Sequence, residues 1–122
     1  MFKTLQGINA TIFAEHKIHF IVFSKAIASS IGHGLSESNV NIEEVKNCTM
    51  DSTELSYQVS YSVDELRFIE VRESVKILMD CLFTNVYNGG FDAYLSDWCE
   101  YSKKPYKCTL SRCKSASILL DY

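Results

Sequence analysis

Cysteine is the residue type in this chain with the widest range of possible chemistry, and the 122 residues include five cysteines. The last three fall close together in a polar stretch that is too hydrophilic for a packed core. A polar, cysteine-dense segment of a small protein is typically stapled by disulfides in an oxidising compartment. We therefore expect residues 99–113 to form a disulfide-stapled, cysteine-rich loop. The disulfide candidates are Cys48, Cys81, Cys99, Cys108 and Cys113.

Because disulfides join cysteines in pairs, one of the five cysteines has no partner within the same chain. One account is a buried thiol, and Cys81 is the candidate because it lies in an apolar helical pattern. The other account is a disulfide to a second chain. Zinc binding is a third use of cysteine, but the chain contains neither Cys-x-x-Cys nor His-x-x-x-His spacing. We expect no metal and no other cofactor.

Histidines and carboxylates supply the remaining catalytic candidates. His16 and His19 could share a helix face and hold a metal, but no third ligand lies nearby, and a solvated helix start explains them. His33 lies between two glycines, which indicates a turn residue rather than a base. Glu43 and Glu44 fall in an expected strand, where neighbouring side chains point to opposite faces and cannot act together. A Cys/His nucleophile pair is conceivable, but disulfides would consume the thiols. We expect no enzyme.

Two N-glycosylation sequons are present, at Asn9-Ala10-Thr11 and at Asn47-Cys48-Thr49. Together with the cysteines they indicate a secreted, extracellular protein that carries N-linked glycans. The first seven residues hold no apolar signal core, and no apolar stretch is long enough to span a membrane. Either the numbering starts on a mature chain, or the protein is cytosolic and the sequons are accidental. We adopt the first reading.

Charge and length limit the remaining classes. Twelve Lys and Arg against fifteen Asp and Glu give a net charge of −3, and without a basic run this argues against nucleic-acid binding. A chain of 122 residues with 47% hydrophobic content is expected to form a single domain over residues 1–122.

Hydrophobic periodicity predicts the elements that must position these side chains. Alternation predicts strands, spacing of three to four residues predicts helices, and glycines mark the helix ends. The expected order is a strand at 8–14, a helix from 18 to the glycines at 32 and 34, strands at 40–45 and 55–63, a helix from 68 to 86, a helical turn at 91–98 and a strand at 116–120. This is an α+β fold of βαββαβ order, the ferredoxin-like arrangement of two helices on one face of an antiparallel sheet.

Several segments together resemble a module found in large extracellular proteins of algae and oomycetes. They are residues 7–11 (GINAT), 23–31 (FSKAIASSI), 37–42 (ESNVNI), 55–63 (LSYQVSYSV) and 86–95 (VYNGGFDAYL). The order of elements also looks like the SEA domains of mucin-like proteins. The resemblance implies an extracellular structural or adhesive role and carries no known chemistry.

These observations favour a structural subunit of an extracellular, glycosylated filament or surface coat. A ferredoxin-like sheet has open edges, and an end strand of one chain can complete the sheet of the next. Residues 1–14 and 115–122 are the expected exchanging ends, with a head-to-tail homopolymer as the result. The alternative is a monomeric secreted adhesion or binding module, or an effector, that presents loop 99–113 to glycans or cell-surface proteins.

Overall fold

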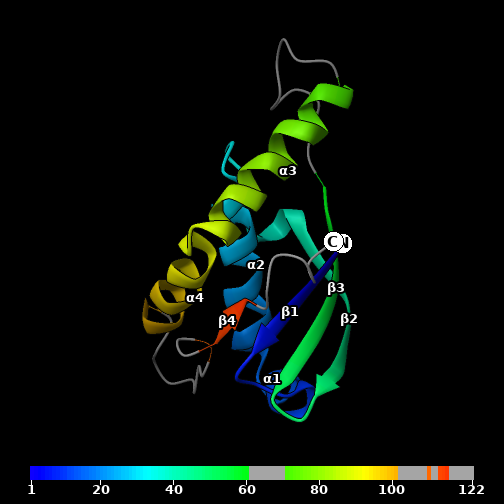
Figure 1. Ribbon diagram of the computed structural model, residues 1–122, viewed down its shortest axis with the longest axis vertical. Coiled ribbons are helices and arrows are strands. Elements are labelled where there is room, and N and C mark those ends of the chain that lie inside the picture. The colour runs from blue at the N-terminus through cyan, green and yellow to red at the C-terminus, as the bar shows by residue number, and fades with distance from the viewer. Residues whose placement is uncertain (61–70, 102–109, 111–112, 116–122) are drawn as a thin grey trace.

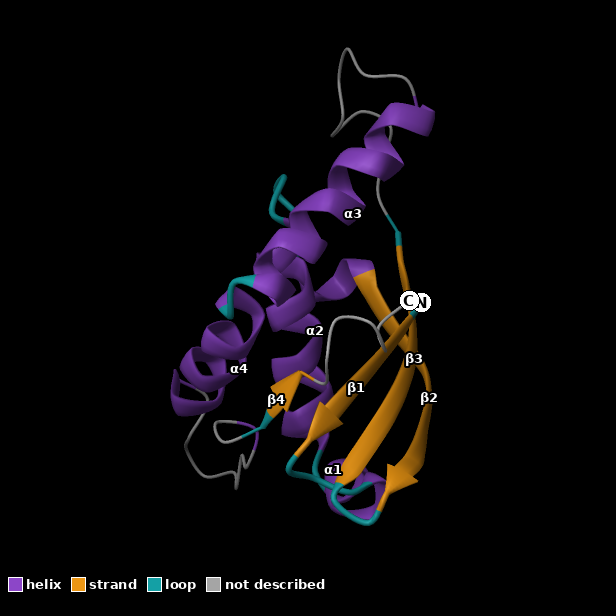
Figure 2. Ribbon diagram, viewed as in Figure 1, coloured by secondary structure: helices purple, strands orange, loops and turns teal. Residues whose placement is uncertain are grey.

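The structure is a computed structural model, and it describes residues 1–60, 71–101, 110 and 113–115. The strands form one sheet, and α2, α3 and α4 pack together beside it (Figures 1 and 2). In chain order the elements are β1 (Phe2–Gln6), α1 (Ala10–Glu15), α2 (Lys17–Ile31), the short 3-10 helix η1 (Glu37–Asn39), β2 (Val40–Thr49), β3 (Ser52–Val59), α3 (Val71–Tyr87), α4 (Gly90–Tyr101) and β4 (Lys114–Ser115).

The sheet is antiparallel, with the strand order β2-β3-β1-β4. β2 and β3 form a hairpin, and β1 pairs with β3 along its whole length. The two residues of β4 lie opposite Leu5 and Gln6 on the other edge of β1. The expected mixture of helices with an antiparallel sheet is therefore confirmed. The strand expected at 116–120 and the end of the strand expected at 55–63 lie outside the described residues.

The strand expected at 8–14 is wrong, because the first strand is β1 and residues 10–15 form helix α1. The chain turns at Gly7, whose φ of +99° suits glycine, and Asn9 then caps the helix. The Asn9 side chain accepts a hydrogen bond of 2.9 Å from the backbone N–H of Ile12. A strand over 8–14 would point Ile12 inward and Phe13 outward, but in helix α1 Phe13 is fully buried and Ile12 is exposed.

Helix α2 is confirmed where the spacing predicted it. It ends at Gly32, which has a φ of +75° and donates its backbone N–H to the carbonyl of Ala28 at 2.8 Å. Its core-facing side includes Val22, Phe23 and Ile27, all fully buried. The middle of α2 thus anchors the hydrophobic core.

A β-bulge changes the side-chain pattern of strand β2. Ile42 pairs with Tyr57 and Glu44 with Ser56, so Glu43 is an extra residue between two register positions. The expectation that Glu43 and Glu44 point to opposite faces is therefore wrong. Both are exposed, and the half-buried Ile42 and Val45 flank them.

Helices α3 and α4 follow one another with a break at Gly89, where φ is +84°. The expected helix from 68 to 86 is confirmed from Val71 onward, and residues 68–70 lie outside the described part of the chain. The expected turn at 91–98 is a full helix of 12 residues, α4. Phe91, Leu95 and Cys99 recur every four residues and are buried on its inner face.

The core joins α2, α4 and the sheet through one aromatic side chain. The ring of Phe23 lies edge-on to Tyr57 of β3 and to Phe91 of α4, with centroids 5.6 and 6.0 Å apart. Leu110 and Cys113 are also buried. The expectation that residues 99–113 are too hydrophilic for the core is therefore wrong at its buried positions, Cys99, Leu110 and Cys113.

Candidate functional site

Both sequon asparagines hold helix α1 in place. Oδ1 of Asn9 caps the helix, and Oδ1 of Asn47 on β2 accepts a hydrogen bond of 3.0 Å from the backbone N–H of Ala10. An N-linked glycan is attached through the side-chain nitrogen, so either asparagine can carry a sugar and keep its Oδ1 as an acceptor. The local structure therefore accounts for both asparagines and remains compatible with glycosylation.

The two sequons face each other across a cavity of about 350 Å³, here called the sequon groove. It is lined by Asn9, Thr11, Asn47, Thr49 and Met50. Met50, at the turn of the β2–β3 hairpin, is 89% exposed. The fold brings together two motifs that are 38 positions apart in the sequence.

The cysteines that the structure describes differ in exposure and in bonding. Cys48 is an exposed thiol on β2, Cys81 is a half-buried thiol on α3, and Cys113 is a buried thiol. Cys99 is disulfide-bonded, but no disulfide has both of its cysteines within the described residues. Cys108 lies outside that part of the chain.

Burial makes Cys113 the least reactive of the three thiols. Desolvation, with a smaller contribution from the negative charge of Asp92, raises the pKa of Cys113 to about 11. The thiolate is the nucleophilic form of cysteine. Cys113 therefore contributes to packing rather than to chemistry.

His16 and His19 do lie together at the start of α2, with ring centroids 5.5 Å apart. The expectation of a solvated helix start is wrong for His19, which is fully buried and donates Nδ1–H to the carbonyl of Phe13 at 2.9 Å. Burial lowers the pKa of His19 below its ordinary 6.5, against the opposing effect of this hydrogen bond. Across the described residues, no group of three His, Cys, Asp or Glu side chains could hold a metal ion.

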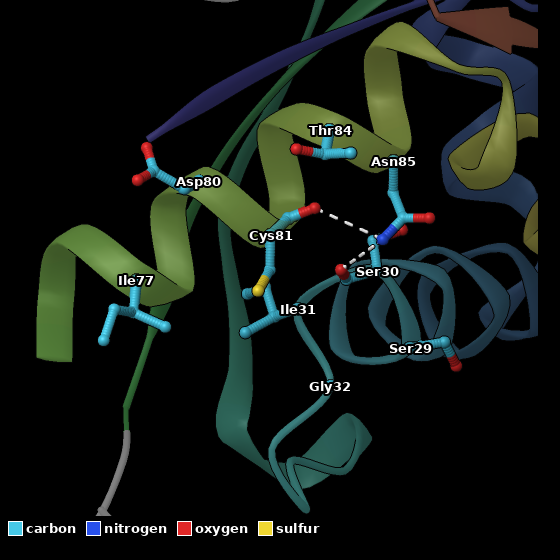
Figure 3. A pocket seen from close by; sticks show the side chains of 9 residues that line it. All are labelled: Ser29, Ser30, Ile31, Gly32, Ile77, Asp80, Cys81, Thr84 and Asn85. Atoms are coloured by element: carbon cyan, nitrogen blue, oxygen red, sulfur yellow. Dashed lines mark hydrogen bonds between the residues drawn. The ribbon is translucent and has the colours of Figure 1, made fainter.

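A second cavity, of about 510 Å³, lies between the end of α2 and the middle of α3 and is here called the thiol pocket (Figure 3). Its lining includes Ser30, Ile31, Asp80, Cys81, Thr84 and Asn85. Figure 3 shows the Cys81 side chain pointing from α3 toward the end of α2. Sγ of Cys81 lies 3.7 Å from Nε2 of His33, within hydrogen-bond distance for sulfur.

His33 reaches Cys81 from an unusual backbone conformation. Its φ is +55°, between Gly32 at +75° and Gly34 at +77°. A non-glycine residue with positive φ costs about 1 kcal/mol or more, and such residues cluster at functional sites. His33 is a turn residue, as its flanking glycines predict, but the sequence reasoning missed its contact with Cys81.

Asn85 holds the two walls of the thiol pocket together. Its side-chain nitrogen donates to the carbonyl of Ser30 at 2.8 Å and to the carbonyl of Cys81 at 3.2 Å (Figure 3). Oγ of Ser30 is buried and has no hydrogen-bond partner among the described residues.

No family model, curated protein or solved structure matches this chain. Among the described helices, none is both long and apolar enough to cross a lipid bilayer.

Proposed function

We propose that the protein is a structural subunit of an extracellular, glycosylated assembly, in which Cys48 forms a disulfide between chains. The observation that carries this proposal is the position of Cys48. Its thiol is exposed, and it lies on β2, one of the two edge strands of the sheet, directly after the sequon residue Asn47. In an oxidising compartment an exposed thiol is available for an intermolecular bridge.

The edge of β2 favours a covalent link over simple strand addition. An open edge can pair with a second chain, but bulges and charged side chains oppose such pairing. β2 has two register shifts, and Glu43, Glu44 and Lys46 are all exposed on it. A disulfide at Cys48 joins chains without a continuous ladder of main-chain hydrogen bonds.

The N-terminal segment is poorly placed to be an exchanging end. Residues 1–14 contain β1, which lies between β3 and β4 in the sheet of its own chain, and helix α1. The amino group of Met1 donates to the carbonyl of Tyr57 at 2.9 Å. Exchange would remove a central strand, so the proposal rests on Cys48. Of the other end, 115–122, the structure describes Ser115 alone.

The arrangement of strands supports a ferredoxin-like fold as part of the proposal. In that fold, two strand–helix–strand units interleave to give one antiparallel sheet. Here the α-helices α1 and α2 lie between β1 and β2, the described helices α3 and α4 lie between β3 and β4, and the strand order is β2-β3-β1-β4. Cross-strand contacts in solution between residues 5 and 115, and between 3 and 55, would test this order.

The functional proposal is tested on protein secreted from eukaryotic cells. We expect disulfide-linked dimers on a non-reducing gel, with a mass above 13.9 kDa per chain after reduction because of attached sugars. Cys48→Ser should give monomers. Cys81→Ser is the matched control and should leave the linked species unchanged, because that thiol is half-buried on another element.

Two results would overturn the proposal. A wild-type protein that is monomeric under oxidising conditions would favour the secreted adhesion or binding module instead. Disulfide-linked species that persist in Cys48→Ser would show that another cysteine forms the bond between chains. Electron microscopy of the linked material then distinguishes a filament from a closed dimer, since a head-to-tail contact does not close.

A further inference from the structure

We infer that Cys81 and His33 form a thiol-exchange site, which takes up a small disulfide and retains half of it as a mixed disulfide in the thiol pocket. The inference is based on the 3.7 Å contact between Sγ of Cys81 and Nε2 of His33, beside a cavity of about 510 Å³. This inference is independent of the proposed role of Cys48, because the two thiols lie on different elements.

His33 is placed to accept the thiol proton. In the tautomer with its proton on Nδ1, the His33 ring accepts a hydrogen bond from the thiol at Nε2. The sulfur of Cys81 then attacks one sulfur of a disulfide R–S–S–R. The Cys81–S–S–R bond forms, the original S–S bond breaks, and the leaving thiolate takes the proton from His33 to become R–SH. No further oxidant or reductant is needed.

The pocket has room and polar groups for the retained half. Ligand cavities typically measure 300–1,000 Å³ and place a few polar groups in a largely apolar lining. The hydroxyl of Thr84 offers a hydrogen bond, and Ile31 and Ile77 offer apolar contact. These groups fit a short aliphatic thiol with a polar end.

The charge in the lining of the thiol pocket should determine which small disulfides react fastest. Asp80 is the formally charged residue among the described lining of the thiol pocket. A carboxylate attracts cations and repels anions. The site should therefore prefer cystamine, whose two ends are ammonium groups, over glutathione disulfide, which carries net negative charge.

The test follows the modification of two thiols in the same full-length protein. Freshly reduced and desalted protein is mixed with cystamine, and the adducts on Cys81 and on Cys48 are followed by peptide mass mapping. In His33→Asn we expect the rate constant at Cys81 to fall about tenfold or more, since positioned bases contribute at least that much. The rate at Cys48 should not change. Asparagine tolerates positive φ, so this substitution keeps the turn.

A second comparison tests the charge preference. Asp80→Asn should lower the ratio of the cystamine rate to the glutathione disulfide rate at Cys81. The same ratio at Cys48 should not change. An unchanged Cys81 rate in His33→Asn, with an unchanged thermal unfolding midpoint, would overturn the inference. The absence of an adduct on Cys81 in the wild-type protein would overturn it as well.

Discussion

Oδ1 of Asn47 lies 3.0 Å from the backbone nitrogen of Ala10 and accepts its hydrogen bond. Ala10 is the middle residue of one sequon and Asn47 is the first residue of the other. The contact joins helix α1 to strand β2 and places both sequons at one end of the sheet. Glycans on this chain would therefore emerge from a single region of the surface.

Two substitutions separate the structural role of Asn9 from glycosylation. Thr11→Ala removes the sequon but leaves the cap, and Thr11 is exposed on a helix, where alanine is favourable. We expect the loss of one glycan with little change in the free energy of unfolding. Asn9→Ala should lose the same glycan and also about 1 kcal/mol, because the hydrogen bond to Ile12 is lost. Mass spectrometry and urea unfolding measure the two effects.

If Thr11→Ala destabilised as strongly as Asn9→Ala, the capping role of Asn9 would not be supported. The comparison is best made on protein treated with an endoglycosidase, so that a glycan does not contribute to the measured stability. Asn9→Ser is a further control, since serine also caps helices and should retain most of the stability.

His19 should make stability depend on pH below neutrality. Because burial lowers its pKa in the folded state from 6.5, the unfolded chain binds a proton more readily than the folded chain. The stabilising contribution is complete above pH 6.5 and is lost as the pH falls toward the lowered value. Urea unfolding at pH 7.5 and at pH 5.5 measures the difference.

His19→Asn isolates this contribution from those of other groups. The asparagine amide can donate to the Phe13 carbonyl as Nδ1 does, but it does not titrate. This variant should be less stable overall and should lose less stability between pH 7.5 and pH 5.5. An identical pH dependence in both proteins would contradict the assignment to His19.

Alkylation should distinguish the three thiols. At pH 8, three units below the pKa of about 11, about one in a thousand Cys113 side chains is a thiolate, and the side chain is also buried. We expect iodoacetamide to label Cys48 and Cys81 in the native protein, and to label Cys113 only after denaturation in guanidinium chloride. Labelling of native Cys113 at the rate of Cys48 would show that its environment is open.

Truncation of Phe23 should be among the most damaging changes in the core. Phe23 is fully buried and contacts aromatic rings on β3 and α4. Phe23→Ala should cost about 3–5 kcal/mol, a large part of the stability of a small domain. Tyr87→Ala is the matched control. Tyr87 is 79% exposed, and its loss should change stability by about 0.5 kcal/mol or less. Chemical unfolding checks both values.

Hydrophobic periodicity predicted the secondary structure correctly where one side of an element packs against the core along its whole length. Residues of α2 repeat with a helical period and end at a glycine, so both the helix and its end could be predicted. The same reasoning failed at residues 8–14 because small alanines made an alternating pattern that a capped helix also satisfies. It failed again at Glu43, where the inserted residue of a bulge reverses the parity of the strand.

The thiol pocket shows a different limit. His33 and Cys81 are 48 positions apart, and neither has a local signature of nucleophilic chemistry. Their contact depends on the packing of α3 against the end of α2, which periodicity within each helix does not define. The glycines on both sides of His33 were the available sequence signal for this site. They indicate a turn with positive φ, in which the His33 side chain can point in a direction that regular secondary structure does not allow.

The central position of β1 has a consequence for how the chain folds during synthesis. β1 is made first, yet it pairs with β3, more than forty residues later, and with β4 at residues 114 and 115. Contacts between such distant segments raise the contact order and slow folding. The nascent chain must keep Leu5, which is fully buried in the finished sheet, exposed until its partner strands leave the ribosome. We therefore expect the sheet to close late, after β4 has been synthesised.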